Sequence, residues 1–376
     1  MSKELGIYIH IPFCKSKCYY CDFISYTNQC SQVESYIQEV SKEMKQYNIS
    51  NYNVTTIYIG GGTPSFMDEK YIKQLLEELK TKLINNETKF EEIEITIEIN
   101  PGTITKQKLE QYKRSGVNRI SIGLQSTNDI LLKQIGRIHN YAEFLEAYQL
   151  VKEVGFENIN IDVMIGLPNQ IIQDIKKTLE EIKKLNPNHV SVYSLMVEEN
   201  TKMENLIAKG ELQLPDEELE RQMYWYVKNT LELNGYKHYE ISNFAKEGKE
   251  SKHNSNCWEQ KEYIGLGASA HSYLHGVRYA NSSFTEAGKW HFKNKEIQER
   301  QSLEDQKREY MLLGLRKLEG VSIQKFKEKF VDNPIFLFRE EIEKLVKQDL
   351  LVVDGDWIRL TNKGIDLANL VWQEFV

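Results

Sequence analysis

Three cysteines, Cys14, Cys18 and Cys21, lie in one short segment near the start of the chain, directly after an apolar stretch at residues 6–11. A thiolate is a soft ligand that suits an iron–sulfur cluster or zinc. Structural zinc takes four protein ligands, and Cys30 and His10, the candidates for a fourth, stand at spacings that fit no zinc pattern. A four-iron cluster held by three cysteines instead leaves its fourth iron open to an outside ligand. The alternatives to a cluster are a zinc loop and three unlinked thiols.

The spacing Cys-x3-Cys-x2-Cys, with Tyr20 before the last cysteine, resembles the radical S-adenosylmethionine (SAM) superfamily. In that superfamily the open iron chelates the amino and carboxylate groups of SAM. The flanking segment from Tyr8 to Cys14 resembles the branch that holds the oxygen-independent coproporphyrinogen III dehydrogenases and the HemW-type haem chaperones. The resemblance implies a 4Fe-4S cluster on Cys14, Cys18 and Cys21.

Length and composition set bounds on the fold and the compartment. The chain has 376 residues, of which 40% are hydrophobic, so it can bury a sizeable core. We expect one large domain and one or two small ones. Five cysteines, three of them clustered, argue against a disulfide framework and for the reducing cytoplasm. The net charge of −7 offers no basic surface for nucleic acid. No apolar run reaches membrane-spanning length, whereas peripheral contact with a membrane stays open.

Short apolar strands alternate with longer amphipathic helices along the first half of the chain. This pattern predicts parallel β/α units. Six strands are expected, at residues 6–11, 56–59, 94–99, 119–124, 158–164 and 189–195. Between the second and third, Ile72, Leu75, Leu76, Leu79 and Leu83 recur at helical spacing and form one apolar stripe. The sequence therefore predicts an α/β fold, an incomplete (β/α)6 TIM-like barrel, which is also the radical SAM architecture.

The chemistry of a β/α fold gathers where its strands end, and here those ends are polar. The second expected strand runs into a glycine-rich turn that resembles the family segment in contact with the amino end of SAM. The later strands end in carboxylates, an amide and an arginine, and the resemblance implies that these bind the ribose, amino and carboxylate groups of SAM. The cofactor-binding residues implied in this way are Tyr8, Tyr20, Gly61, Gly62, Thr63, Glu98, Gln125, Arg137 and Asp162.

A second segment of interest runs from residue 252 to 258. It resembles the His-Asn-x-x-Tyr-Trp segment that is linked to haem in the HemW-type chaperones, and it includes His253. Cys257 stands where the family has Tyr. Imidazole and thiolate are both haem-iron ligands, and His253 is the expected one. The alternative is a histidine that packs against Trp258 without binding a ligand.

The rest of the chain is expected to add smaller units. A long helix is predicted from residues 212–216 to about Leu233, followed by a strand at 236–244. The tail alternates helices with a hairpin that has an Asp-Gly turn, a winged-helix-like pattern. This tail carries 12 Lys and Arg against 14 Asp and Glu, which argues against DNA binding. The expected domains are a barrel at 1–200, a capping region at 201–280, a linker at 281–302 and a winged-helix-like domain at 303–376.

Two members of the resembled branch compete as functions. The dehydrogenase carries a fourth cysteine two residues after the third, where this chain has Phe23. It also has a long N-terminal arm over its active site, whereas here only about five residues precede the first expected strand. Both differences favour a haem chaperone, which binds haem, the cluster and SAM and passes haem to an unidentified acceptor protein. The alternatives are the dehydrogenase and a radical SAM enzyme with another substrate. Whether the chain is an enzyme stays open at this point.

Overall fold

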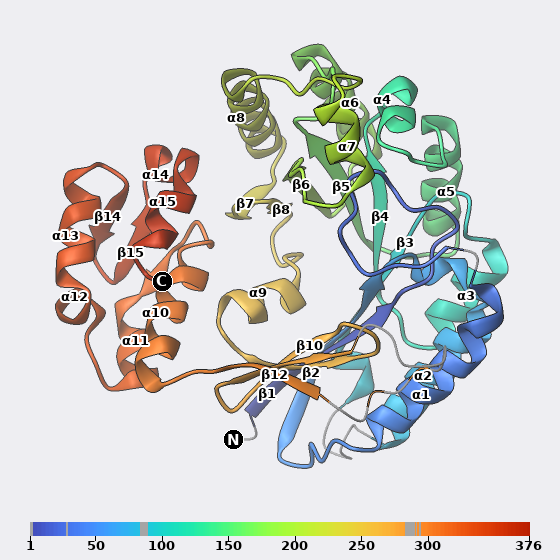
Figure 1. The fold of residues 1–376 in the computed structure, drawn as a ribbon, viewed down its shortest axis with the longest axis horizontal. Helices are drawn as coiled ribbons and strands as arrows, with labels where there is room; N and C mark the ends of the chain where they lie inside the picture. The colour runs from blue at the N-terminus through green and yellow to red at the C-terminus, as the bar shows by residue number, and fades with distance from the viewer. Residues whose placement is uncertain (1–2, 28, 83–88, 283–289, 291, 293–294) are drawn as a thin grey trace.

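A computed structural model describes residues 3–27, 29–82, 89–282, 290, 292 and 295–376. Six parallel strands lie side by side in chain order, and helices cover their outer face (Figure 1). The strands are β1 (Lys3–Ile11), β2 (Tyr52–Gly61), β3 (Glu94–Ile99), β4 (Arg119–Gln125), β5 (Asn158–Ile165) and β6 (His189–Ser194). The helices between them are α1 (Val33–Met44), α2 (Glu69–Lys82), α3 (Lys106–Arg114), α4 (Asp129–Gln134), α5 (Tyr141–Glu153) and α6 (Ile172–Leu185). The predicted run of six β/α units is confirmed.

The two faces of this sheet differ in polarity. The predicted apolar stripe of α2 is buried at Ile72, Leu75, Leu76 and Leu79, and Leu83 lies outside the described residues. Successive side chains of a strand point to opposite faces, so the buried isoleucines of β3 meet the helices while its polar side chains face the barrel interior. The interior is therefore polar, which suits a ligand better than a packed apolar core. No described helix is both long and apolar enough to cross a membrane.

Beyond β6 the chain forms α7 (Lys202–Ala208), α8 (Glu217–Leu233) and a tight hairpin. The long helix predicted to end near Leu233 is confirmed, and the Asp216 side chain caps it by accepting the Leu219 N–H at 2.8 Å. The single strand expected at 236–244 is wrong. It breaks into β7 (Lys237–Glu240) and β8 (Asn243–Ala245), which pair antiparallel, with β8 next to β6.

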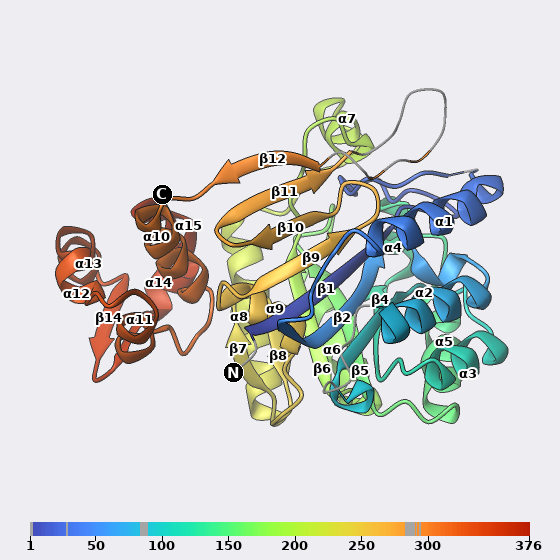
Figure 2. The same ribbon diagram turned by 90° about the horizontal axis from the view of Figure 1, so that it is seen from below.

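Four more strands extend the sheet on the other side of β1. β9 (Glu262–Leu266) runs parallel to β1, and β10 (His271–Leu274), β11 (Val277–Asn281) and β12 (Lys295–Arg300) follow antiparallel (Figure 2). Over the described residues the resulting sheet has 12 strands, with β7 and β12 at its two edges. Within that part of the chain the sheet does not close on itself, so the predicted incomplete barrel is confirmed.

Part of the segment expected to be a linker, residues 281–302, is a strand instead. Lys295–Arg300 forms β12 and pairs with β11. The side chains of Trp290 and Phe292 are buried against the barrel core, with the ring centroids of Trp290 and Tyr36 at 4.9 Å. The remaining residues of this segment between 283 and 294 lie outside the described part of the chain. The described residues of this segment are therefore held to the barrel by buried aromatic side chains and by strand pairing.

The C-terminal unit has a hydrophobic core of its own around Met311, Phe326 and Phe338. Its helices are α10 (Leu303–Gly314), α11 (Ile323–Phe330), α12 (Pro334–Leu337), α13 (Arg339–Lys347), α14 (Asn362–Asp366) and α15 (Ala368–Gln373). Its three-stranded sheet consists of β13 (Val321–Ser322), β14 (Leu351–Asp354) and β15 (Trp357–Leu360). The predicted hairpin is present between β14 and β15, with Gly355 at a φ of 59° in its turn. Helices combined with a small hairpin sheet give the expected winged-helix-like arrangement.

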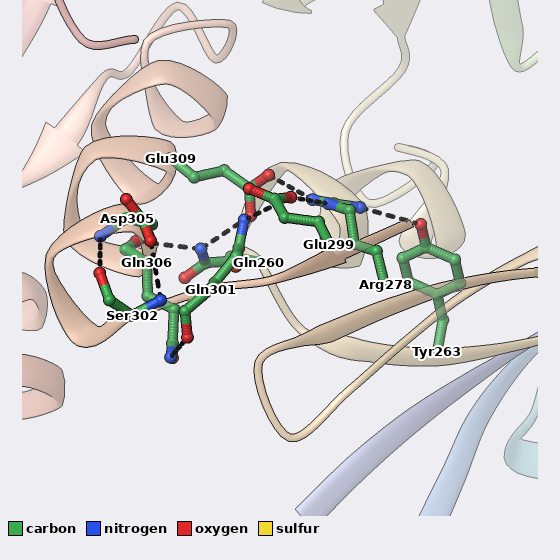
Figure 3. A network of polar contacts seen from close by, with 9 residues as sticks. All are labelled: Gln260, Tyr263, Arg278, Glu299, Gln301, Ser302, Asp305, Gln306 and Glu309. Atoms are coloured by element: carbon green, nitrogen blue, oxygen red, sulfur yellow. Dashed lines mark hydrogen bonds and ion pairs between the residues drawn. The ribbon is translucent and has the colours of Figure 1, made fainter. Parts of the chain in front are cut away.

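A polar network joins this unit to the sheet extension (Figure 3). Glu309 of α10 is at its centre, because its carboxylate accepts from Arg278 of β11 and from the Gln260 amide. Arg278 also lies 3.5 Å from the Glu299 carboxylate and donates to the Tyr263 hydroxyl at 3.4 Å. The C-terminal unit is therefore held by directed hydrogen bonds and ion pairs.

Candidate functional site

The cysteine loop leaves the carboxyl end of β1 and folds back on itself. The Cys14 N–H donates to the Tyr26 carbonyl at 3.0 Å, and the Tyr26 N–H donates to Pro12 at 2.6 Å. Further along, the Tyr19 N–H donates to the Ile135 carbonyl after α4, at 3.0 Å. These backbone contacts fix both ends of the loop against the barrel, so the three thiols have defined positions.

One cavity of about 170 Å³ opens beside this loop at the carboxyl ends of the strands. The three cysteines lie on one side of it and polar groups from later strands on the other. Of the residues expected to bind the cluster and SAM, those that line the cavity are Cys14, Cys18, Cys21, Tyr20, Gly61, Gly62, Thr63, Glu98, Gln125, Arg137 and Asp162. The structure thus brings together thiols, carboxylates, an amide and a guanidinium from five strands and the segments after them.

The three thiols lie on one side of the cavity without forming, among the described residues, a site for a single ion. Within the described residues, no three metal-ligating side chains converge on one point where a single ion would sit. A four-iron cluster binds each thiolate through a different iron, so it does not require that convergence. Burial, followed by the negative charge of Cys18, raises the pKa of Cys21 to about 11. A positive metal centre would offset this cost, because a coordinating thiol is deprotonated by the metal.

Two glycines allow the backbone after β2 to approach the cysteine loop. Gly61 has a φ of 113°, and a Cβ there would lie 2.5 Å from the His10 ring. A Cβ on Gly62 would lie 2.9 Å from the Cys14 sulfur. The Gly62 N–H donates to Ile11 at 2.8 Å and the Thr63 N–H to Phe13 at 2.9 Å. Only glycine fits both positions, as the sequence indicated from its triple-glycine turn.

Glu98 lies at the end of β3 and accepts two hydrogen bonds on the cavity wall. The Tyr58 hydroxyl donates to one carboxylate oxygen at 2.8 Å and the Gly61 N–H to the other at 3.1 Å. Burial and the nearby Asp162 carboxylate outweigh these donors and raise the pKa of Glu98 to about 7. Glu98 therefore changes its charge within the physiological pH range.

Asp162 and Gln125 reach the cavity from β5 and β4. The Asp162 carboxylate accepts from the Asn160 amide at 2.7 Å and from the Ser121 hydroxyl at 3.1 Å, although burial still raises its pKa. Gln125 has a φ of 67°, and the register between β4 and β5 shifts at this point. A shift of this kind re-aims a side chain next to a functional site.

Arg137 follows α4 and reaches back over the cavity. One guanidinium nitrogen lies 3.7 Å from the Cys18 sulfur, and the other donates to the Gly123 carbonyl at 3.0 Å and to the Asn100 amide oxygen. Its Nε is buried without a hydrogen-bond partner among the described residues. The residue that was expected to face the SAM carboxylate thus contacts Cys18, one of the three cysteines expected to hold the cluster. Asn100 and Ser121 also line the cavity, and the sequence reasoning did not select them.

Two residues expected to bind cofactors do not line this cavity. Tyr8 stacks on Tyr58, with ring centroids 6.2 Å apart, and hydrogen-bonds His10 at 3.0 Å. His253 lies in α9 (Lys252–Trp258), and its Nδ1 is 2.9 Å from the Thr56 hydroxyl. Both residues contact Tyr58 and not the cavity.

The environment of His253 is closed. Its side chain is buried, its ring centroid lies 5.2 Å from that of Tyr58, and its backbone N–H donates to Glu94 at 3.1 Å. Burial, together with the positive charge of Arg119, lowers the pKa of His253 to about 4. The imidazole is therefore neutral and keeps a lone pair for a metal, but its ring is packed inside the protein.

The chain is similar to known proteins in sequence and in fold. The profile of the radical SAM superfamily matches residues 8–182, and that of the HemN C-terminal domain matches residues 301–367. Relatives named heme chaperone HemW include those of Lactococcus lactis, 38% identical over 100% of this chain and 98% of the relative, and Bacillus subtilis, 37% identical over 98% of each.

One solved structure matches over the full chain. Coproporphyrinogen III oxidase (HemN) from Escherichia coli, described as a radical SAM enzyme, aligns with a TM-score of 0.83 at 22% identity, covering 100% of this chain and 90% of that one. At this identity the match establishes the fold. It extends from β1 through the C-terminal unit.

Proposed function

The chain belongs to the family of HemW heme chaperones within the radical SAM superfamily, and from this we propose that it binds haem and passes it to an acceptor protein. The observation that carries the proposal is the 38% identity to a HemW chaperone over the whole chain, barrel and C-terminal unit included. The acceptor protein is not identified by the sequence. Unpaired cysteines, one of them exposed, support a reducing compartment, so we place the protein in the cytoplasm.

We propose that Cys14, Cys18 and Cys21 hold a 4Fe-4S cluster. Their side chains line one side of the cavity, and the backbone contacts of the loop keep them there. When bound, such a cluster offers an open iron to SAM and supplies one-electron chemistry. Cys30 is exposed and Cys257 lies in α9, so neither belongs to this group.

The polar side of the cavity is proposed to bind SAM. Glu98 and Asp162 would accept hydrogen bonds from ribose hydroxyls and the ammonium group, and Gln125 offers an amide beside them. Arg137 would pair with the carboxylate through its free Nε. Tyr20, Gly61, Gly62 and Thr63 would enclose the methionine end. Tyr8 would act from behind, by holding Tyr58 and through it Glu98.

His253 is proposed as the haem-iron ligand. Two features support it: its place in the family's haem-linked segment and its neutral imidazole. Cys257, which stands where the family has Tyr, departs from that segment and is the competing donor. Because its ring is buried against Tyr58 and hydrogen-bonded to Thr56, the haem complex requires the start of α9 to move.

The alternative function is that of an oxygen-independent coproporphyrinogen III dehydrogenase. The fold shared with HemN is compatible with this function. It is weak support, because one fold can host several functions. Against it stands Phe23, which is 60% exposed at the cavity where the dehydrogenase has its fourth cysteine.

The test uses full-length protein with its cluster reconstituted without oxygen. On adding haem, we expect a Soret band that saturates at one haem per chain. Incubation with SAM, a reductant and coproporphyrinogen III should leave the porphyrinogen mass unchanged. If the porphyrinogen loses two carboxyl groups and haem does not bind at one per chain, the proposed chaperone function is wrong and the dehydrogenase function takes its place.

A further inference from the structure

The helix α9, which carries His253, lies between the barrel and the C-terminal unit and is held at both of its ends (Figure 1). At its start Glu94 of β3 accepts from the Lys252 N–H at 3.2 Å and from the His253 N–H at 3.1 Å. The Thr56 hydroxyl of β2 lies 2.9 Å from Nδ1 of the His253 ring. These contacts with the barrel keep the imidazole inside the protein.

The far end of α9 is anchored by Gln260, which follows the helix and is buried. Its side-chain amide donates to the Glu309 carboxylate of α10 at 2.9 Å (Figure 3), and its amide oxygen accepts from Lys329 of α11 at 2.9 Å. Beside it, Glu259 lies 3.4 Å from Lys317 of the C-terminal unit. Gln260 has a φ of 51°, the left-handed backbone that ends a helix. Gln260 is therefore a fixed point about which α9 can turn.

Trp258, the last residue of α9, makes a different kind of contact with the C-terminal unit. The guanidinium carbon of Arg316 lies 4.4 Å from the centroid of the Trp258 ring and 4.9 Å from that of Trp372 in α15. A cation over the face of an aromatic ring is attracted by the ring's quadrupole. The Arg316 carbonyl accepts from the Ile241 N–H at 3.1 Å, and the negative charge of Glu240 on β7 attracts its guanidinium. Arg316 is thus held in place, and a movement of α9 has to break its contact with Trp258.

The junction around Arg316 is stacked but poorly hydrogen-bonded. The Nε of Arg316 and the indole nitrogens of Trp258 and Trp372 are all buried without a hydrogen-bond partner among the described residues. A buried donor without a partner is unfavourable, and water would satisfy it once the junction opened. Opening therefore loses the stacking but gains hydrogen bonds to water. This balance suits a contact that opens and closes, in contrast to the hydrogen-bonded anchor at Gln260.

We propose that the stack of Trp258 on Arg316 is a latch on the haem site. While it is closed, the start of α9 stays on the barrel with His253 buried, and when it opens, α9 turns about Gln260 and presents the imidazole to haem. A helix of about two turns moves as a unit, because its backbone hydrogen bonds are made within it. The release of the imidazole therefore also pulls Trp258 away from Arg316. The inference rests on the proposed haem function and adds the contact that controls access to its ligand.

The first measurement is amide hydrogen exchange of the full-length protein without haem, read by mass spectrometry on the peptide that covers the start of α9. The N–H groups of Lys252 and His253 donate to Glu94, so they exchange only when the start of α9 leaves the barrel. In Arg316→Met, which keeps most of the side-chain volume but not the charge, we expect this exchange to be about tenfold faster.

Two further variants complete this measurement. Lys344→Met is the matched control, because it removes an ion pair with Glu374 at 2.6 Å within the C-terminal unit, and it should leave the exchange of α9 unchanged. Trp258→Leu removes the same stack from the side of α9, so it keeps the test open if Arg316→Met does not fold. It should speed the exchange equally, and adding Arg316→Met to it should have no further effect. Unchanged exchange in the two stack variants, or the same acceleration in Lys344→Met, would overturn the proposal.

The second measurement is haem binding by the same proteins in stopped-flow absorbance. Haem should associate about tenfold faster with Arg316→Met than with the wild-type protein, because a larger fraction of the molecules has α9 released. Faster exchange of α9 with an unchanged rate of haem association would show that α9 does not control the haem site, and the proposal would be wrong. Failure of the proposed function looks different: the wild-type protein would then give no Soret band at one haem per chain, while the exchange of α9 would still respond to Arg316→Met.

Discussion

The Nη1 of Arg137 lies 3.7 Å from the sulfur of Cys18, in hydrogen-bonding contact. Arg137 comes from the segment after α4, and Cys18 from the loop after β1. Through this contact a residue expected to bind SAM also touches the group expected to bind the cluster. The two sides of the cavity are therefore in electrostatic contact. A substitution of Arg137 should thus change both SAM binding and the properties of the cluster, and each effect can be measured separately.

The first prediction concerns the cluster ligands. Protein purified without oxygen should be brown and hold four irons per chain, and Cys14→Ala, Cys18→Ala and Cys21→Ala should each lose most of that iron. Cys30→Ala is the matched control, since Cys30 is exposed and outside the cavity and its removal should change nothing. Iron and sulfide analysis is the measurement. Full iron content in Cys18→Ala would rule out the three-cysteine cluster.

The second prediction separates SAM binding from the cluster. Arg137→Met should weaken SAM binding roughly tenfold to a hundredfold, the equivalent of about 1.5–3 kcal/mol for a lost charged hydrogen bond, while iron content is retained. Because it also removes a donor to Cys18, the cluster potential should become more negative. Asp162→Asn is the control, because Asp162 contacts Ser121 and Asn160. It should weaken SAM binding and leave the potential unchanged, as calorimetry and a redox titration would show.

The third prediction concerns haem. His253→Ala should abolish the stoichiometric Soret band, whereas Cys257→Tyr, which restores the family pattern, should retain it. Thr56→Val tests the closed position of the ring, because it removes the hydrogen bond to Nδ1 and should ease the release of the imidazole. We expect Thr56→Val to bind haem faster in stopped-flow absorbance. If His253→Ala binds haem like the parent, the ligand lies elsewhere, and the exposed His271 is the next to test.

The fourth prediction concerns the turn after β9. Gly267 has a φ of 92°, and a Cβ there would lie 2.2 Å from the Tyr36 hydroxyl oxygen and 2.8 Å from the His10 carbonyl. Gly235 has a φ of 83° but no atom within 4 Å of such a Cβ. In both alanine variants the left-handed backbone should lower the free energy of unfolding by about 1–2 kcal/mol. Gly267→Ala should lose about 1–3 kcal/mol more from crowding, as measured by urea denaturation. Equal losses would mean that Tyr36 moves aside freely.

The parts of the site that the sequence could predict are those set by local pattern. The cysteine loop, the glycines after β2 and the polar ends of β3, β4 and β5 follow from short-range spacing and from the rule that such ends meet at one edge. That rule would also have selected Asn100, which directly follows β3 and accepts from Arg137.

The parts that could not be predicted depend on contacts between distant residues. The position of His253 against Tyr58 requires the whole barrel, since no pattern within α9 reveals what its side chain faces. The hairpin of β7 and β8 was missed for a similar reason. Apolar alternation continues through Ile241, and the break is fixed by the pairing of β8 with β6.

The place of β1 in the sheet has a consequence for how the protein folds as it is made. β1 pairs on one side with β2, but on its other side Leu5 meets Glu262 of β9. Ribosomes add about 5–20 residues per second, so one edge of the first strand waits roughly 10–50 s for its partner. During that interval the nascent chain exposes unpaired backbone along β1, the strand that leads into the cysteine loop. Stable closure of the site is therefore expected only once β9 has been made and has paired with that edge.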